Sequence, residues 1–209
     1  MCRSNGRARA LWRLALVLLA FVPAAAAQSP AAPAPGLAAS RVAAERAHLL
    51  RVGAWGGTAV LSGAALLLLS GRDADGRRAF GMQTAAWGAV NLAIAGVALA
   101  QPGEAAVSLA GALADENRLG DILWLNTGLN VGYVAVGTTL YAVGARAGVA
   151  RPDAWRGHGA AVVVQGLGLL VLDGVALAAS RTRQGALVDL LSGVAVVPAA
   201  GGLAVTVAL

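Results

Sequence analysis

The sequence predicts an all-α integral membrane protein, a helical bundle of four transmembrane spans with a candidate fifth, after an N-terminal signal peptide. Three observations predict this fold class. The chain has 209 residues, of which 58% are hydrophobic and 12% charged, with a mean hydropathy of +0.70, whereas a soluble domain carries about 25% charged residues. Several apolar runs reach the roughly 20 residues that a helix needs to cross a bilayer. Arginines gather in the segments between alternate runs.

Residues 1–27 have the pattern of a secretory signal peptide. A basic start is followed by an apolar run over residues 11–22, a proline, and alanines that permit cleavage after Ala27. The alternative is an uncleaved anchor, but the apolar run is short for a helix that needs about 20 residues to cross the bilayer. We therefore expect a mature chain that begins at Gln28.

Removal of that segment excludes several classes of function. The segment holds four arginines and no acid, so its loss lowers the net charge from +6 to +2. It also holds Cys2, the single cysteine, so the mature chain can form neither disulfides nor a cysteine–zinc site. The remaining charge is too small for a nucleic-acid-binding surface. The expected partners are the lipid bilayer and, as a ligand, a small solute or a proton.

The mature chain is expected to begin with a Pro/Ala linker over residues 28–36. Residues 37–51 then form an amphipathic helix at the membrane interface, because Arg41 and Glu45 lie one turn apart on a polar face. The transmembrane bundle follows over residues 52–209.

Four apolar runs are expected to cross the bilayer, namely residues 52–70, 79–100, 122–143 and 159–179. A last stretch, residues 186–209, is long enough to cross, but Asp189, Pro198 and a glycine pair interrupt it. It is either a fifth span or a kinked, re-entrant segment. A short interfacial helix is expected over residues 104–117, between the second and third spans.

Loop charges predict the orientation of the bundle. Signal-peptide cleavage places the mature N-terminus in the periplasm of a bacterium, with the spans in the cytoplasmic (inner) membrane. The two loops then predicted inside, residues 71–78 and 144–158, hold six arginines, whereas the outer loops, residues 101–121 and 180–185, hold three. The N-terminal tail adds three arginines outside, which weakens the contrast.

The sequence also contains an internal repeat. Residues 81–100 and 159–178 align with eight identities in twenty positions, including Gly88 with Gly166. The second and fourth spans cross in the same direction, so the repeat would be parallel, with two helical hairpins related by an axis along the membrane normal. The first and third spans give no convincing match.

Polar side chains lie deep inside three of the predicted spans, where hydrocarbon makes unpaired hydrogen-bonding groups costly. Asn91, Asn130 and Asp173 each stand roughly ten residues from the same membrane face. The residues that we expect to form a common polar layer, and to bind a ligand there, are Asn91, Asn126, Asn130, Tyr133, Gln165 and Asp173. The alternative is a structural role, in which the asparagine amides bond across to Gln165 or Asn91 and fix helix packing.

Asp173 gives the sharpest chemical signal. An ionised aspartate at the centre of a span costs about 2.5–3.5 kcal/mol on insertion scales, so it needs a proton, a partner or water. It is either a proton- or cation-binding carboxylate or a structural acid that accepts hydrogen bonds from Asn130 or Tyr133. Arg181 and Arg183 are long enough to reach back to it as partners.

The sequence gives no positive support for an enzyme. His48 and His158 are predicted at opposite membrane faces, which disfavours a haem or a histidine metal site. No motif of a known catalytic or nucleotide-binding site is present in its required context. We therefore predict no catalytic residue, no cofactor and no metal.

Two further features concern packing. Trp55, at the outer end of the first span, is predicted to anchor that helix at the interface. Gly128 and Gly132 form a GxxxG pair, which predicts a close helix contact. The glycine-rich helix faces also permit a homo-oligomer.

Three segments, residues 87–94 (WGAVNLAI), 123–133 (LWLNTGLNVGY) and 165–173 (QGLGLLVLD), carry a resemblance to known proteins. Together they resemble a family of small uncharacterised bacterial polytopic membrane proteins, over the second to fourth spans. The resemblance implies a fold type and no activity. Members of that family have an aspartate where this chain has Asn130, so an essential charge is not expected at this position.

Two hypotheses about function follow. The first is a membrane protein whose internal polar layer binds or conducts a small solute or a proton. The second is a structural or assembly protein whose polar residues only fix helix packing. The substitution Asp173→Asn should separate them, because a structural acid tolerates its isostere whereas a proton-binding site loses activity.

Overall fold

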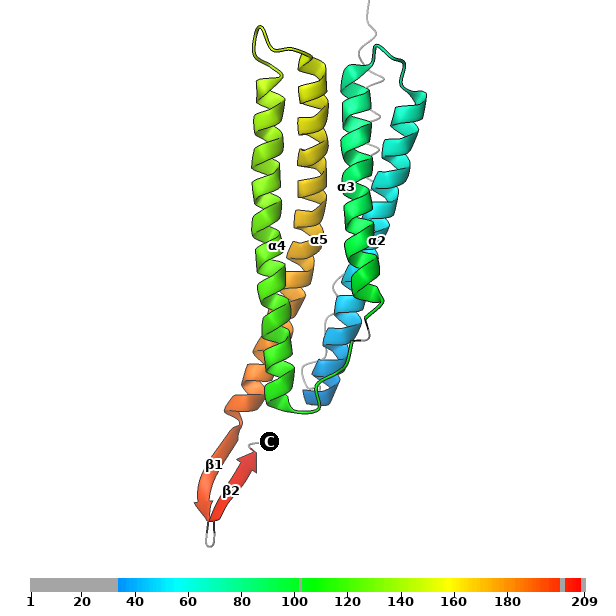
Figure 1. Ribbon diagram of the computed structural model, residues 1–209. Coiled ribbons are helices and arrows are strands. Elements are labelled where there is room, and N and C mark those ends of the chain that lie inside the picture. The colour runs from blue at the N-terminus through cyan, green and yellow to red at the C-terminus, as the bar shows by residue number, and fades with distance from the viewer. Residues whose placement is uncertain (1–33, 102, 200–201, 208–209) are drawn as a thin grey trace, which may run out of the picture.

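The computed structural model describes residues 34–209 except 102, 200, 201, 208 and 209, with side chains described up to residue 193. Four helices follow one another and a two-stranded hairpin ends the chain (Figure 1). The elements are α2 (Ala34–Leu69), α3 (Asp75–Leu99), α4 (Leu109–Val143), α5 (Pro152–Ser192), β1 (Val194–Ala199) and β2 (Gly202–Val207). The predicted signal peptide, residues 1–27, lies outside the described residues, as does most of the predicted linker.

The four helices form two antiparallel hairpins, α2 with α3 and α4 with α5, and α3 packs on α5 (Figure 1). Glycines bring the helices of each hairpin together. A Cβ atom added to Gly88 of α3 would lie 2.5 Å from the carbonyl oxygen of Gly56 in α2. In the second hairpin, a Cβ on Gly159 of α5 would lie 2.5 Å from the carbonyl oxygen of Gly137 in α4. Only a residue without a side chain fits between backbones this close.

The glycine contacts agree with the predicted repeat and extend it. Gly81 and Gly159 occupy matching positions in the aligned segments, and Gly81 packs on Gly63 of α2 as Gly159 packs on Gly137 of α4. The repeat therefore includes the first and third spans, for which the sequence alone gave no convincing match.

Local sequence explains where the helices begin and end. Ser108 caps α4, its side chain accepting a hydrogen bond of 3.1 Å from the backbone N–H of Gly111. Pro152 occupies the first turn of α5, where its missing N–H costs nothing. Gly71, Gly144 and Gly193 follow the ends of α2, α4 and α5, and glycine is a poor helix former because its backbone loses much freedom on folding.

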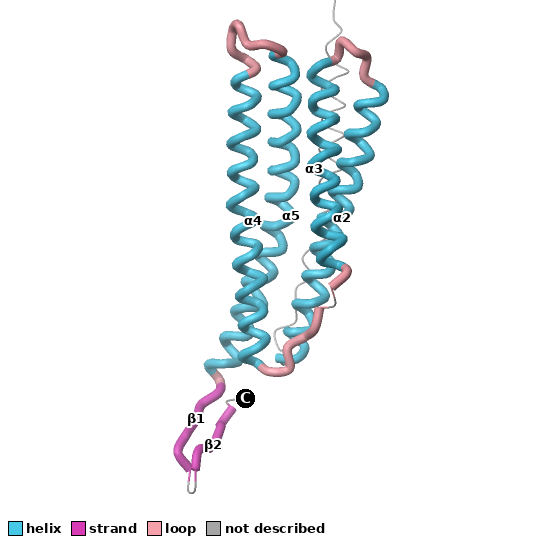
Figure 2. The backbone as a smooth tube through the Cα atoms, viewed as in Figure 1, coloured by secondary structure: helices cyan, strands magenta, loops and turns pink. Residues whose placement is uncertain are grey.

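Helix length divides the bundle into two parts. α3 has 25 residues, whereas α2, α4 and α5 have 36, 35 and 41. At 1.5 Å per residue, α3 is about 38 Å long and α5 about 60 Å. The three longer helices therefore continue together past the end of α3 (Figures 1 and 2). We call this part, residues 34–48, 109–121 and 178–192, the three-helix extension.

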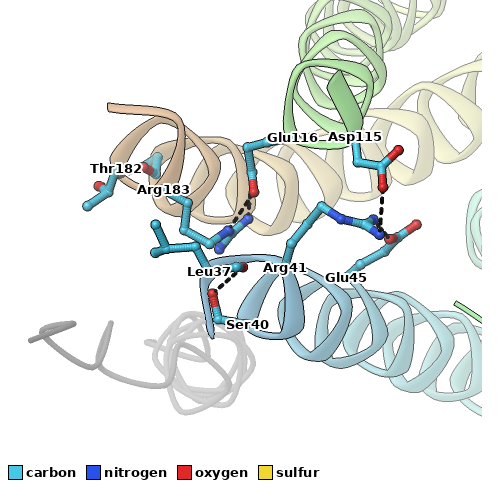
Figure 3. A network of polar contacts seen from close by, with 9 residues as sticks. Leu37, Ser40, Arg41, Glu45, Asp115, Glu116, Thr182 and Arg183 are labelled. Carbon is cyan, nitrogen blue, oxygen red and sulfur yellow. Dashed lines mark hydrogen bonds and ion pairs between the residues drawn. The ribbon is translucent and has the colours of Figure 1, made fainter. Parts of the chain in front are cut away.

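The extension has its own core. Leu37, Ala38, Ala112 and Leu187 form a buried apolar cluster between the three helices. Beside it, Arg183 of α5 makes two hydrogen bonds of 2.9 Å to the carboxylate of Glu116 in α4, and both side chains are 1% exposed (Figure 3). Arg41 of α2 lies 2.7 Å from Glu45 and 3.6 Å from Asp115 of α4 (Figure 3).

Three of the described helices, α2, α3 and α5, are long and apolar enough to cross a membrane. The segment predicted as the third span, residues 122–143, is helical, but the helix that contains it, α4, is not among these three. The outer surfaces of α2, α3 and α5 are apolar, as lipid contact requires, because large side chains such as Leu61, Ile94 and Val171 are more than half exposed.

The prediction of a fifth span over residues 186–209 is wrong. α5 continues without a break to Ser192, so the outer loop predicted at 180–185 is also wrong. Residues 194–199 and 202–207 form two antiparallel strands, in which Val194 pairs with Val207 and Ala199 with Gly202. β-branched valines fit a strand better than a helix, and Pro198 cannot sit inside a helix.

The two predicted interfacial helices are ends of longer helices. Residues 37–51 continue directly into the first span as part of α2, and residues 109–117 begin α4. These segments differ from the predicted separate helices because they pack on one another and enclose the core of the three-helix extension.

Candidate functional site

Asp173 of α5 is the centre of a buried polar cluster. Asn130 Nδ2 of α4 donates a hydrogen bond of 2.6 Å to Asp173 Oδ2, and His48 Nε2 of α2 lies 3.1 Å from Asp173 Oδ1. The exposed fractions are 8% for His48, 3% for Asn130 and 4% for Asp173. Three helices therefore bring an imidazole, an amide and a carboxyl group together away from solvent.

The cluster lies where the four-helix part of the bundle meets the three-helix extension. Gly53 of α2 packs against Ala95 of α3, with 3.5 Å between an added Cβ on Gly53 and Ala95 Cβ. Ala95 lies one turn before the end of α3, and His48 lies just over one turn before Gly53. Because α2 and α3 are antiparallel, His48 stands level with the end of α3.

A second polar contact lies about two turns deeper in the bundle. Trp55 Nε1 of α2 donates a hydrogen bond of 2.8 Å to Gln165 Oε1 of α5. The indole ring lies over Gly168, where any Cβ atom would overlap it. Trp55 and His48 are seven residues apart, and so lie on one face of α2, as Gln165 and Asp173 do on α5. The α2–α5 contact therefore carries two polar levels.

The remaining predicted residues lie outside these two polar contacts between α2 and α5. Tyr133 of α4 packs edge-on against Trp87 of α3, with ring centroids 4.7 Å apart and an interplanar angle of 83°. Asn91 is 5% exposed beside Gly56 of α2, and its Nδ2 has no hydrogen-bond partner among the described residues. Asn126 is partly buried and makes no side-chain hydrogen bond within the described part of the chain.

Several predicted pairings differ from those in the structure. The hydrogen bond from Asn130 to Asp173 is present, whereas Gln165 bonds Trp55 and not an asparagine. Neither predicted arginine partner reaches Asp173. Arg183 pairs with Glu116, and Arg181 bonds Gln184 with its guanidinium 6.0 Å from the ring centre of Trp124. Each arginine therefore has a polar or aromatic partner in or beside the three-helix extension, closer than Asp173.

Two packing predictions are corrected as well. Trp55 points into the bundle instead of anchoring at the interface, because Gln165 offers its N–H a buried acceptor. Gly128 and Gly132 face open space, with no atom within 4 Å of an added Cβ. The close contacts fall on other glycines, such as Gly56 and Gly63.

His48 is the residue that the sequence analysis missed. It was assigned to a separate surface helix, whereas α2 is continuous and carries His48 to the level of Asp173. One signal was available, since His48 and Trp55 lie at helical spacing and no proline or glycine separates residue 48 from the first span before Gly53.

With this geometry in place, comparison with known proteins adds the following. Residues 51–174 match a family described as a family of unknown function, DUF6992. The chain belongs to this family. The DUF6992 segment includes all of α3 and α4 and ends one residue after Asp173, whereas His48 precedes it. Neither a curated protein nor a solved structure matches the chain.

Proposed function

We propose that this protein is a four-span membrane protein that takes up and releases a proton at the buried His48–Asp173 pair. The 3.1 Å contact between His48 Nε2 and Asp173 Oδ1 is the observation on which the proposal rests. An ionisable group inside a membrane bundle is a functional hypothesis by default, because hydrocarbon makes it costly to retain. A contacting imidazole and carboxyl group can exchange protons under ordinary conditions.

The charge balance of the cluster leaves room for one proton. With His48 neutral and Asp173 ionised, the three side chains carry one net negative charge, and no arginine lies within ion-pair distance of Asp173 among the described residues. One added proton makes the cluster neutral.

The atoms available define where the proton goes. If the Nε2–H of His48 donates to Asp173, Nδ1 holds the free lone pair, and Nδ1 is buried without a hydrogen-bond partner among the described residues. An incoming proton can bind at Nδ1 to give an imidazolium beside a carboxylate, or reside on the carboxyl group beside a neutral imidazole. Asn130 donates to the second carboxylate oxygen and holds the group in place.

The membrane placement is part of the proposal. The four-helix part, level with α3, would lie in the bilayer, because 25 residues are about 38 Å and the hydrocarbon core is about 30 Å thick. The charged extension would stand on the periplasmic side of a bacterial inner membrane, with the arginine-bearing loops after α2 and α4 in the cytoplasm. The cluster would then face the outer boundary.

A structural role is the second candidate. Both carboxylate oxygens of Asp173 already have partners from two other helices, which would fix the register of α2 and α4 against α5. Interhelical hydrogen bonds of this kind contribute about 1 kcal/mol each, and no proton exchange is needed for that role.

Spectroscopy on the two ionisable side chains separates the candidates. The chain has two histidines, so protein labelled with 15N-histidine gives signals from His48 and His158 alone. We expect the His48 imidazole signals, and a carboxyl infrared band that Asp173→Asn removes, to change reversibly with pH while the protein stays folded. The matched control is Asp189→Asn, an exposed carboxyl on the same helix. If neither side chain changes its protonation, the proposal fails and the structural role remains.

A further inference from the structure

A second hydrogen-bonded histidine stands at the opposite end of the four-helix part. His158 Nδ1, near the start of α5, lies 3.2 Å from Gln83 Oε1 of α3, and both side chains are partly buried. His158 and Asp173 are fifteen residues apart on one helix, so about 22 Å separates them along the axis. This separation is most of the thickness of the hydrocarbon core, which is about 30 Å.

Gln165 lies between these ends on the same helix. It is seven residues after His158 and eight before Asp173, and its side chain is 2% exposed. Those steps correspond to about 10 Å and 12 Å along the helix. α5 therefore carries three polar levels at nearly even spacing, with a hydrogen-bond partner from α3, α2 or α4 at each level.

Two buried polar groups of α3 lie close to the levels of His158 and Gln165. α3 and α5 run in the same direction (Figure 1), so equal steps from the Gln83–His158 contact reach equal depth. By this count Thr84, one residue after Gln83, lies about 1.5 Å past the level of His158, and Asn91, eight residues after Gln83, lies about 1.5 Å past the level of Gln165. Thr84 Oγ1 and Asn91 Nδ2 are buried and have no partner among the described residues. Such groups normally bind ordered water, which can carry protons between side chains.

The surroundings of His158 suit a site that exchanges protons with the aqueous phase. The charged groups on the neighbouring parts of α5 and α3 are exposed. Arg156 pairs with Asp153 at 3.5 Å and Arg151 with Asp75 of α3 at 3.3 Å, whereas Arg77 and Arg78 of α3 form no ion pair among the described residues. α2 has no ionisable side chain between Arg51 and its end, and α4 offers only Tyr133 and Tyr141 between Asp121 and its end.

We propose that His158, Gln165 and the His48–Asp173 pair form a proton path across the membrane, with water bound at Thr84, close to the level of His158, and at Asn91, close to the level of Gln165. This inference depends on the proposed function and adds the second terminus and the route. Only protons move. His158 accepts a proton from water on one ring nitrogen and releases one from the other, so no oxidant, reductant or co-reactant is needed.

The path predicts proton flux through vesicles that contain the purified full-length protein. The vesicles enclose a pH-sensitive dye, and valinomycin with a potassium gradient supplies the driving voltage. We expect wild-type protein to conduct protons faster than protein-free vesicles do, and His158→Gln to reduce the flux to the protein-free level. Glutamine keeps a side chain that can bond Gln83 but cannot carry a proton. Arg146→Gln, an exposed substitution in the loop at the same end, should leave the flux unchanged.

The outcomes separate the path from the proton site. If His158→Gln abolishes flux while the infrared band of Asp173 still responds to pH, the path is supported. If wild-type protein gives no flux although that band responds, the path is overturned and the proposed function stands. If wild-type protein conducts and His158→Gln conducts equally well, the route through His158 is wrong. Absence of both flux and the Asp173 response overturns both proposals.

Discussion

At the scale of single residues, the ion pair of Arg183 with Glu116 should matter most for stability. Both side chains are 1% exposed, so removing one partner leaves a buried charge without compensation. Such changes cost about 3–5 kcal/mol. Glu116→Gln should therefore lower the melting temperature in detergent well below that of wild type.

A matched pair of residues provides the control. Gln184 Nε2 donates a hydrogen bond of 2.6 Å to Asn117 Oδ1, joining the same two helices one residue further along, but this contact is exposed. Asn117→Ala should change the melting temperature little. Equal losses from Glu116→Gln and Asn117→Ala would contradict the importance that we assign to burial.

The sequence predicted part of the polar cluster because its cues are local to each helix. Asp173 and Asn130 stand out as polar groups inside apolar runs, and one of the predicted hydrogen bonds to Asp173, that from Asn130, is present. His48 was not included, because its contact with Asp173 depends on α2 continuing without a break from residue 34 into the first span. Pairings such as Trp55 with Gln165 depend on the rotation of each helix, which hydropathy does not encode.

At the scale of helices, the glycines divide into those that touch a backbone and those that do not. A Cβ added to Gly88 would lie 2.5 Å from Gly56 O and 2.8 Å from Ala59 Cβ, whereas one added to Gly128 meets nothing within 4 Å. Gly88→Ala should force α2 and α3 apart and lower the melting temperature. Gly128→Ala should leave it unchanged or raise it slightly, because alanine favours a helix over glycine by about 1 kcal/mol.

The same measurement tests a dimer at the exposed glycines. Gly128 and Gly132 would have to be covered if α4 of one copy packed on α4 of another. In that case Gly128→Ala would destabilise the protein and reduce its size in detergent, and our assignment of this face to lipid would be wrong.

Element boundaries show the limit of reading hydropathy alone. The cores of the first, second and fourth predicted spans lie in helices that are apolar and long enough to cross a membrane. The ends differ, because Leu37, Ala112 and Leu187 bury one another outside the four-helix part and so extend three helices into a separate core. Length alone predicts a span for the last apolar stretch, but valines at five of its strand positions favour the hairpin of β1 and β2.

At the scale of the whole molecule, the number of crossings decides where the C-terminus lies. In the structure, the start of α2 and the end of α5 are at the same end of the bundle, and the loop after α2 is at the other end (Figure 1). If all four helices cross, three crossings separate that loop from the C-terminus, which then lies on the opposite side of the membrane. A fifth span, or a fourth helix that does not cross, would place both on the same side.

Reporter fusions should therefore give opposite results at the two positions. Fusion after Ala74, in the loop between α2 and α3, should make green fluorescent protein fluoresce and leave alkaline phosphatase inactive, because this loop is proposed to be cytoplasmic. Fusion after Leu209 should make alkaline phosphatase active and leave green fluorescent protein dark, because four crossings return the chain to the periplasm. Active phosphatase after Ala74 would invert the orientation and place His158, instead of His48, at the outer end of the proton path. Matching results at both positions would mean either that a fifth segment crosses or that one of the helices after that loop, such as α4, does not. In the second case the polar cluster of Asn130, His48 and Asp173 would not lie within a bundle of four transmembrane helices, and the proposed proton path could not be enclosed by four such helices.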